Sequence, residues 1–479
     1  MFPEDYLIHR KRLIRLWIAE GFIEQRGACS LEDTAEGYLT ELARRSMLQV
    51  VRRNSFGRIK CLRMHDLVRE LAIFQSKKES FSTTYDENHG VIHEGLDYRR
   101  VSVLQGNRGI PSIIDPSRLR SFITFDTSMA LSSWYSFISS KPKYLAVLDL
   151  SGLPIETIPN SVGELFNLRL LCLDDTNVKE LPKSVTQLQN LQTLSLEHAQ
   201  LLNFPQGFSK LKKLRYLYAS RLQDVTYKKF IVWESVEPFK GLWSLNELQT
   251  LGSIKASEVF VAKLGNLSQL RSLTFCDVRS RHCAQLCDSL SKMLHLSLLT
   301  IRACNEDELL QLDNLTFPNP LQKFQVVGRL SEGTLESPFF LNHGPALLEI
   351  QLSYSQLTEN QLSRLSELSN LTELSLRKAY TGQQLYFHAN GFRNLKKINL
   401  SDLPHVNKIC IHKGALVSLE YLRIHSLQEL RDVPIGIDCL TSVKEAYFID
   451  MHSDFARNLR RAKLDHIPNI SILRTQGRH

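Results

Sequence analysis

The chain has 479 residues, of which 43% are hydrophobic and 23% are charged, and its formal net charge at pH 7 is +9. This composition is typical of a folded protein with two or more domains or one long repeat array, and it excludes an intrinsically disordered chain. No apolar run approaches the ~18 residues of a membrane span, the N-terminal stretch MFPEDYLIHRKRL lacks the apolar core of a signal peptide, and nine scattered cysteines suit reduced thiols better than a disulfide framework.

The first eighty residues carry the pattern of a small domain made of helices and a hairpin. Residues 5–22 predict an amphipathic helix that ends at a glycine, and residues 34–45 predict a second helix. Two short strands follow, MLQVVRR at 47–53 and RIKCLR at 58–63, with a turn between them. Helices followed by such a hairpin indicate a winged-helix-like domain over residues 1–80.

A third helix is predicted over residues 65–75, directly after the second strand. Asp66 is positioned to cap it, because a short acidic side chain accepts hydrogen bonds from the free backbone amides of a first turn. The apolar residues spaced for its buried stripe are Leu67, Val68, Leu71 and Ala72. These local rules do not explain the histidine that precedes Asp66.

Most of the chain consists of one internal repeat. The pattern L-x-x-L-x-L starts at 145, 168, 191 and 214, each 23 residues apart, and from 371 onward it recurs every 24 residues. With a weaker first match, LRSFIT at 119, there are 13 or 14 units. This period predicts a leucine-rich-repeat domain over residues 116–479, with 81–115 as a linker or first-repeat cap. The predicted fold class is α/β: a horseshoe-shaped solenoid with a parallel sheet on its concave face, preceded by the winged-helix-like domain.

Within each predicted strand, period 2 sends the leucines inward and the residues between them outward, onto the concave face. The outward set combines both charges with interleaved tyrosines, which suits a protein partner, and the plainer interpretation of any one of these residues is that it solvates the sheet. The residues that we predict to contact a partner are Tyr216, Tyr218, Arg377, Lys397, Tyr421, Arg423, His425 and Tyr447.

Three N-terminal motifs resemble a known family. FPEDY at 2–6, LIRLWIAEGFI at 13–23 and MHD at 64–66 match, in order and spacing, the end of the nucleotide-binding switch region (NB-ARC) of plant intracellular disease-resistance receptors of the coiled-coil class. Repeats such as LCLDDTNVKELPKSVTQLQNL also look like the repeat variant of these nucleotide-binding leucine-rich-repeat proteins. The resemblance covers essentially the whole chain, which corresponds to the C-terminal part of such a receptor.

The resemblance implies a role for the MHD motif, Met64-His65-Asp66. In the family the histidine faces the phosphates of bound ADP and the motif helps to hold the receptor at rest, so His65 would be a phosphate-facing donor and Asp66 a support for the turn. A helix N-terminus itself favours a nearby anion. Without the family match, a hydrogen-bonded core histidine is the simpler interpretation of His65.

The chain departs from the family pattern in its nucleotide-binding motifs. It contains no G-x-x-x-x-G-K-[ST] phosphate-binding loop, no acidic magnesium strand and no upstream coiled coil. Because it opens inside a family motif, we expect a truncated product, a gene-model fragment or a designed protein. ADP or ATP is the cofactor implied for the full-length family, whereas this chain alone is expected to bind ADP weakly or not at all. No catalytic arrangement stands out, so no enzymatic activity is predicted.

The resemblance also implies partners and a location. The repeats would recognise a pathogen effector, or a host protein altered by one, and would pack against an upstream nucleotide-binding domain of the same chain. Oligomerisation would follow activation in the full-length receptor only. The implied location is the cytoplasm, with the nucleus or the inner face of the plasma membrane as alternatives, and neither a nucleic-acid partner nor a membrane span is expected.

Other interpretations share parts of the pattern. An extracellular leucine-rich-repeat receptor ectodomain is favoured by glycosylation sequons and opposed by the odd cysteine count. A winged-helix nucleic-acid-binding protein is favoured by HRKRLIR at 9–15, a run that more often forms the solvated face of a helix. A zinc site is weakly favoured by one C-x-x-x-C pair within a cysteine cluster. The sequons lie at Asn266, Asn314, Asn370 and Asn469, and the cluster comprises Cys276, His282, Cys283, Cys287 and Cys304.

Overall fold

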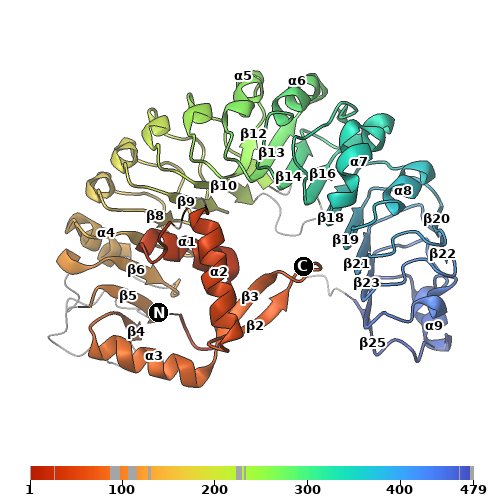
Figure 1. The fold of residues 1–479 in the computed structure, drawn as a ribbon, viewed down its shortest axis with the longest axis horizontal. Helices are drawn as coiled ribbons and strands as arrows, with labels where there is room; N and C mark the ends of the chain where they lie inside the picture. The colour runs from red at the N-terminus through yellow and green to blue at the C-terminus, as the bar shows by residue number, and fades with distance from the viewer. Residues whose placement is uncertain are drawn as a thin grey trace. The chain divides into compact units, whose positions relative to one another are not determined.

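The computed structural model describes residues 2–25, 27, 29–86, 98–105, 116–127, 131–222, 229–230, 233–462 and 464–474. The chain divides into two compact units, Met1–Lys255 and Ala256–His479. Each unit is built on a parallel β-sheet of leucine-rich repeats, and the first unit also contains the N-terminal helical domain (Figure 1). The division therefore falls within the repeats, and the N-terminal domain belongs to the same compact unit as the early repeats.

The N-terminal domain has the predicted winged-helix order, with one additional short strand. An antiparallel sheet of order β1-β3-β2 joins the hairpin to that strand. The elements are β1 (Ile8–His9), α1 (Arg10–Glu20), α2 (Leu31–Arg44), β2 (Leu48–Arg53), β3 (Ile59–Met64) and α3 (Asp66–Lys78).

Local chemistry accounts for the ends of these elements. Helix α1 ends at Gly21, whose positive φ of 80° a glycine adopts without strain. Helix α2 begins at Ser30, whose hydroxyl accepts a hydrogen bond from the amide of Asp33 at 3.2 Å. The hairpin turns at Asn54, whose side-chain oxygen accepts from the amide of Arg58 at 2.7 Å.

The prediction for helix α3 was correct in position and wrong in burial. Leu67 and Leu71 are 72% and 63% exposed, Ala72 is exposed, Val68 is half-buried, and no residue of α3 is fully buried. The N-cap position belongs to His65, and Asp66 is the first helical residue, where its charge favours the helix N-terminus. The apolar stripe thus exists, but it is not covered by any described part of this chain.

The sheet of the first unit begins earlier than predicted. Strands β4 and β5 lie in the segment assigned to a linker or cap, and they already pair in parallel with each other and with β6. Strand β11 (Trp233–Ser235) pairs antiparallel with β10, and helix α4 (Leu131–Ser139) connects β6 to β7. The parallel strands are β4 (Thr83–Asp86), β5 (Arg100–Gln105), β6 (Ser121–Thr124), β7 (Val147–Asp149), β8 (Leu170–Cys172), β9 (Thr193–Glu197), β10 (Tyr216–Leu222) and β12 (Thr250–Lys255).

The second unit continues the same construction. Its sheet strands are β13 (Ser272–Val278), β14 (Leu298–Ala303), β16 (Lys323–Val327), β18 (Glu349–Ser353), β19 (Glu373–Arg377), β21 (Lys397–Ser401), β23 (Tyr421–His425), β24 (Glu445–Ile449) and β25 (Asn469–Leu473). Its helices are α5 (Glu258–Lys263), α6 (Ser280–Leu290), α7 (Pro338–His343), α8 (Glu359–Ser366) and α9 (Ser453–Arg461). Two further two-stranded sheets pair β15 (Leu309–Leu310) with β17 (Arg329–Leu330) and β20 (Gln384–Phe387) with β22 (Lys408–Ile411).

The repeat register stacks equivalent residues of successive units. Leu148, Leu171 and Leu194 pair in adjacent strands of the first unit and are fully buried. Asparagine side chains tie some repeats to the next: the amide of Asn370 donates to the carbonyl of Pro345 at 2.7 Å, and Asn190 and Asn394 make similar bonds to Phe166 and Ser369. This confirms the predicted leucine-rich-repeat solenoid, in which each unit completes the core of its neighbour.

The cysteines are free thiols. Burial raises the pKa of Cys283 to about 11 and that of Cys287 to about 12, which keeps these thiols protonated. Within the described ranges, no three His, Cys, Asp or Glu side chains gather as metal ligands, so the zinc interpretation has no geometric support. In the same part of the chain, no helix is long and apolar enough to cross a bilayer.

Candidate functional site

The candidate site is the contact between the winged-helix domain and the open face of the first-unit sheet, meaning the face opposite the repeated leucines. Helix α1 lies against this face (Figure 1). Leu16 and Ala19 form one buried apolar cluster with Ile123, Val147 and Leu170. Because the other side of α1 packs into the winged-helix core, the helix is buried between the two parts.

The basic run HRKRLIR is engaged within the chain. The Arg12 guanidinium is 2.7 Å from the carboxylate of Asp149, whose side chain is almost fully buried, and Arg10 pairs with Glu36. The guanidinium of Arg15 lies 4.9 Å from the ring centroid of Tyr218, a cation–π contact.

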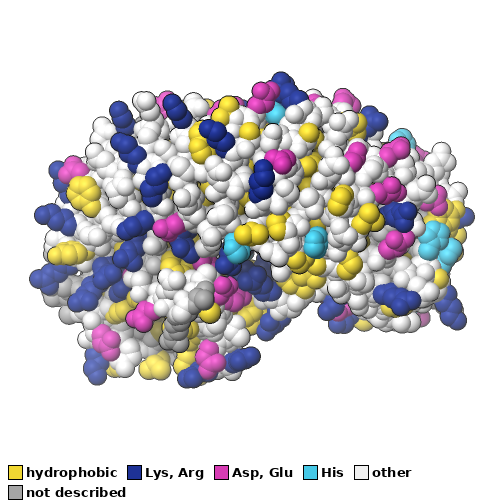
Figure 2. All heavy atoms as spheres, turned by 45° about the horizontal axis from the view of Figure 1, so that its top comes forward, with side chains coloured by type: hydrophobic (Ala, Val, Ile, Leu, Met, Phe, Trp, Pro, Cys, Tyr) yellow, Lys and Arg dark blue, Asp and Glu magenta, His cyan; other side chains and the backbone are white. Residues whose placement is uncertain are grey.

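These contacts contradict the interpretation of the three arginines as a solvated face, whereas His9 and Lys11 of the same run are exposed. Burial alone would lower the pKa of Arg12, but the charge of Asp149 outweighs burial and raises it. Lys and Arg side chains are also spread over the outer surface of the early repeats (Figure 2). The basic run therefore serves to dock the helix onto the sheet.

A buried ion pair fixes the C-terminal end of α1. The carboxylate of Glu20 is 2.9 Å from Nη2 of Arg100 on β5, and both side chains are only 6% exposed. The hydroxyl of Ser121 donates to the same carboxylate. The rings of Phe81 and Phe22 lie 4.1 and 5.0 Å from the Arg100 guanidinium, so the pair is shielded from water.

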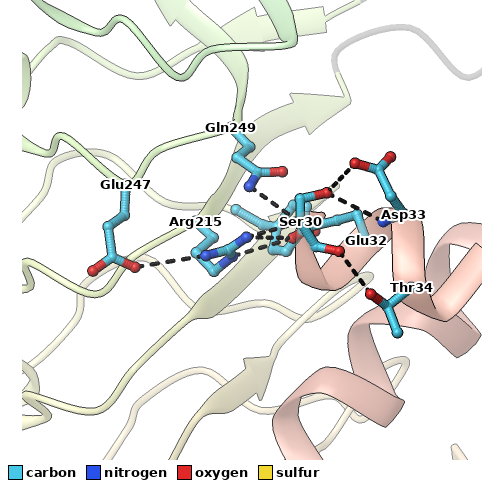
Figure 3. Close-up of polar contacts among 8 residues, drawn as sticks. Ser30, Glu32, Asp33, Thr34, Arg215, Glu247 and Gln249 are labelled. Carbon is cyan, nitrogen blue, oxygen red and sulfur yellow. Dashed lines mark hydrogen bonds and ion pairs between the residues drawn. The ribbon is translucent and has the colours of Figure 1, made fainter. Parts of the chain in front are cut away.

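A second polar cluster holds the start of α2, and it is drawn in Figure 3. Nη2 of Arg215 donates to both carboxylate oxygens of Glu32, at 2.7 Å from Oε2 and 2.9 Å from Oε1. The hydroxyl of Tyr216 and the amide of Gln249, the latter at 3.1 Å, donate to the same carboxylate. Glu247 lies 3.7 Å from the far side of the guanidinium. We call Glu32, Arg215, Tyr216 and Gln249 the Glu32 clamp.

The Glu32 clamp stabilises the ionised form of its carboxylate. Burial opposes the charge of Glu32, but the charge of Arg215 and the hydrogen bonds from Tyr216 and Arg215 outweigh burial, so that the pKa of Glu32 falls below its usual 4.5. Burial conversely raises the pKa of Tyr216, which remains a neutral hydroxyl donor.

Two predicted partner residues are therefore occupied. Tyr216 is 7% exposed and bonded to Glu32, and Tyr218 lies beneath Arg15. The prediction placed them correctly on the open face but wrongly on a free surface, because α1 and α2 cover this part of the sheet. Another protein could reach them only after the winged-helix domain moved away.

The remaining predicted partner residues lie on the open face of the second-unit sheet, and each is half-buried. They fall on four neighbouring strands: Arg377 on β19, Lys397 on β21, Tyr421, Arg423 and His425 on β23, and Tyr447 on β24. The alternation of leucines and outward residues therefore holds throughout this set.

The MHD residues lie where β3 meets α3. Met64 ends the strand, and His65 precedes the helix without a side-chain capping bond. Nδ1 of His65 and Nε of Arg69 are buried and have no hydrogen-bond partner in the described chain. Unpaired N–H groups beside the N-terminus of a 13-residue helix could donate hydrogen bonds to a phosphate oxygen, so these residues fit the anionic end of a nucleotide. A cavity of about 80 Å³ lined by Met64 and Arg69 lies nearby.

The docking residues Glu32, Arg215, Gln249 and Asp149 were not predicted from the sequence. Glu32 lies just before the helix predicted over residues 34–45, and in the structure it is an acid in the first turn of α2, a placement that the helix dipole explains by itself. Asp149 could have indicated the docking contact, because a buried acid on the open face of a strand is expected to pair with a cation.

Known proteins contain the same two kinds of domain. The family model described as "Leucine-rich repeat region" matches residues 118–466. The family model described as "Disease resistance protein Winged helix domain" matches residues 1–72. The chain is 35% identical to disease resistance protein RPM1 of Arabidopsis thaliana and 25% identical to disease resistance RPP8-like protein 3 of the same plant, over 98% of this chain in both cases.

The chain spans about half the length of these curated relatives, 51% and 52% respectively. Among solved structures, a leucine-rich-repeat protein of Leptospira interrogans is 20% identical, with a TM-score of 0.44 over 78% of this chain and 89% of that one. Both family matches agree with the two parts of the fold. The chain belongs to the leucine-rich-repeat proteins of the plant disease-resistance family and carries that family's winged-helix domain at its N-terminal end.

Proposed function

We propose that this chain is the sensing and restraining part of a plant immune receptor. In this proposal the later repeats recognise a pathogen effector or a host protein altered by one, and the early repeats hold the winged-helix domain in its resting position. The proposal draws on the family membership and on the docking contacts, and it assigns the chain no catalytic role.

The observation that carries the restraint is the Glu32 clamp. It joins α2 to repeat residues 183 positions away through a bidentate ion pair. Together with the pairs Arg12–Asp149 and Glu20–Arg100, it holds the winged-helix domain through three separate charged contacts. Charged contacts can be exchanged for water or for other partners, which suits a joint that has to open.

We extend the proposal to the nucleotide switch in receptors that contain a nucleotide-binding domain. There the exposed apolar face of α3, formed by Leu67, Leu71 and Phe74, would pack against that domain. His65 would donate to a phosphate oxygen of ADP, and Asp66 would support the turn. ADP or ATP would supply the change in charge that the winged-helix domain senses, whereas this chain alone would hold ADP weakly or not at all.

Effector contact would then weaken the restraint, and oligomerisation would follow in the full-length receptor. The six half-buried residues on the open face of the second unit support a protein partner, because tyrosine and arginine anchors are enriched at such interfaces. The proposal places the receptor in the cytoplasm, the nucleus or at the inner face of the plasma membrane.

The test joins this chain to the nucleotide-binding half of a relative and measures cell death in leaf tissue. Glu32→Gln and His65→Ala should each cause signalling without effector, because each removes a resting-state contact. Glu41→Gln, which disrupts an exposed pair on the same helix α2, should stay silent. Silence from Glu32→Gln at normal protein levels would exclude the clamp as a restraint, and silence from His65→Ala would remove His65 from the switch.

A second arm of the same assay tests recognition. Replacing Tyr421, Arg423 and Tyr447 together by alanine should abolish the response to an effector without causing signalling in its absence. An intact effector response in this triple variant would show that the proposed recognition surface is wrong.

A further inference from the structure

Several charged side chains on the open face of the second-unit sheet are paired within the chain. Lys323 pairs with Glu349 on the neighbouring strand. Further along the sheet, Arg377 reaches Asp402 at 3.4 Å. Such pairs neutralise each other locally, so they leave little net charge to attract a partner.

The histidine at the end of β23 also has an acidic partner, since Nε2 of His425 lies 3.4 Å from the carboxylate of Asp450. Arg423 on the same strand has no such partner among the described residues. It forms no ion pair with any described residue, and its Nε is buried without a hydrogen-bond partner. An orphaned donor on a half-buried cation costs free energy, and an incoming anion would recover it.

Two tyrosines and an asparagine lie beside Arg423, on its own strand and on the two adjacent strands. The rings of Tyr421 and Tyr447 are 5.3 Å apart on adjacent strands, and the hydroxyl of Tyr447 donates to Glu445 at 3.1 Å. Glu445 is thereby directed to the tyrosine. On the other side, Asn399 pairs in register with Arg423.

Lys397, which pairs in register with Tyr421, likewise forms no ion pair in the described part of the chain. We call Lys397, Tyr421, Arg423 and Tyr447 the Arg423 surface. Two cations that form no ion pair with a described residue thus lie beside two aromatic rings.

We propose that the Arg423 surface binds an Asp or Glu side chain of an extended segment of a protein partner. The guanidinium of Arg423 would donate two hydrogen bonds to the carboxylate. Apolar atoms of the neighbouring residues in the partner segment would pack on the tyrosine rings. This assignment rests on the proposed recognition role of the later repeats and specifies the chemistry of the partner.

The surrounding charges favour a protein over a nucleic acid. Glu373 pairs in register with Lys397, and Glu445 pairs in register with Tyr421, so two carboxylates flank the Arg423 surface. They would repel the regularly spaced phosphates of a nucleic acid, whereas a single carboxylate between uncharged residues fits between them.

The probe is a phage-displayed library of random peptides, panned against the purified full chain, with affinities then measured by fluorescence polarisation. Selected peptides should contain Asp or Glu, and changing that acid to its amide should weaken binding about tenfold. Arg423→Gln should weaken binding by the same factor, and the two changes together should cost little more than either alone. Arg423→Lys should recover only part of the affinity, because lysine cannot make the bidentate contact.

Arg431→Gln is the matched control, because Arg431 is exposed, lies outside β23 and pairs only loosely with Asp454 at 3.9 Å. It should leave the affinity unchanged. The melting temperature of Arg423→Gln should equal or exceed that of the wild type, since Arg423 has no partner to lose. Selected peptides without acids, an unchanged affinity of Arg423→Gln, no selectable peptide at all, or displacement by single-stranded RNA would each overturn the proposal.

The receptor assay separates this inference from the proposed function. If the triple alanine variant abolishes the effector response and Arg423→Gln does not, recognition occurs on this surface without a carboxylate. If both variants respond normally, the recognition surface itself is wrong. Loss of the response in both, with Arg431→Gln unaffected, is the result that we expect.

Discussion

Arg215 and Glu32 lie 183 residues apart in sequence, yet the guanidinium Nη2 of one is within 2.9 Å of both carboxylate oxygens of the other. The two side chains are 14% and 16% exposed, so water screens them only partly. Through this pair the first turn of α2 is fixed to the repeat sheet. The winged-helix domain and the early repeats are therefore joined by contacts between residues far apart in sequence.

The Glu32–Arg215 pair should contribute measurably to docking. In a double-mutant cycle with Glu32→Gln and Arg215→Gln, we expect a coupling free energy of roughly 1–3 kcal/mol, because the pair is bidentate and largely shielded from water. Hydrogen exchange of the amides of helix α2 reports the free energy of local opening.

The control for this cycle is the exposed pair of Glu41 and Arg45, one turn apart on α2 with side chains 50% and 65% exposed. Exposed pairs of this kind are worth about 0.5 kcal/mol or less. A Glu32–Arg215 coupling no larger than that of the control would contradict a clamping role.

Docking should also weaken in acid. Since the pKa of Glu32 is lower in the folded state than its usual 4.5, its ionised form adds stability that is complete above pH 4.5 and is lost as the pH falls through the folded-state pKa. Hydrogen exchange of α2 should therefore accelerate below pH 4.5, after correction for intrinsic rates.

Two other carboxylates on the same face act in the opposite direction. Burial raises the pKa of Asp174 and of Glu197, so their protonation favours the folded state as the pH falls. The difference between wild type and Glu32→Gln removes this shared background. If both proteins show the same pH profile, Glu32 is not the group that titrates at this contact.

The fold was predictable because its period is written in the residues. Leu148, Leu171 and Leu194 recur every 23 positions, and that spacing by itself requires stacked strands with a common core. The hairpin was predictable for the same reason, since alternation and a glycine turn act over a few residues. The repeats depend on contacts between positions separated by a constant period, and the hairpin depends on contacts between positions a few residues apart.

The docking site depends on contacts without such a pattern. Glu32 lies outside the helix predicted over residues 34–45, and Arg12 was interpreted as part of a solvated face, so neither was linked to a partner far away in sequence. Helix α3 shows the converse limit: the spacing of Leu67 and Leu71 correctly indicates an apolar face, but periodicity cannot say what covers it. Sequence thus predicts which face a residue occupies better than which residue it meets.

The buried pair of Glu20 and Arg100 should behave as a unit. Removing one partner leaves an uncompensated buried charge, so Glu20→Met or Arg100→Met alone should destabilise the first unit by about 3–5 kcal/mol. The double variant should be more stable than either single variant, since it buries no charge. Urea unfolding measures these changes, and strictly additive losses would show that the two groups do not depend on each other.

The apolar face of α3 should contribute almost nothing to the stability of this chain. Leu67, Leu71 and Phe74 are 72%, 63% and 65% exposed, so replacing all three by glutamine removes little buried area and should change the free energy of unfolding by less than about 1 kcal/mol. The matched core variant Leu39→Ala, at a fully buried position of α2, should cost about 2–5 kcal/mol. A large loss of stability in the triple variant would mean that α3 is buried in solution, whereas an unchanged stability with reduced self-association on gel filtration would identify this face as a surface that a further domain covers.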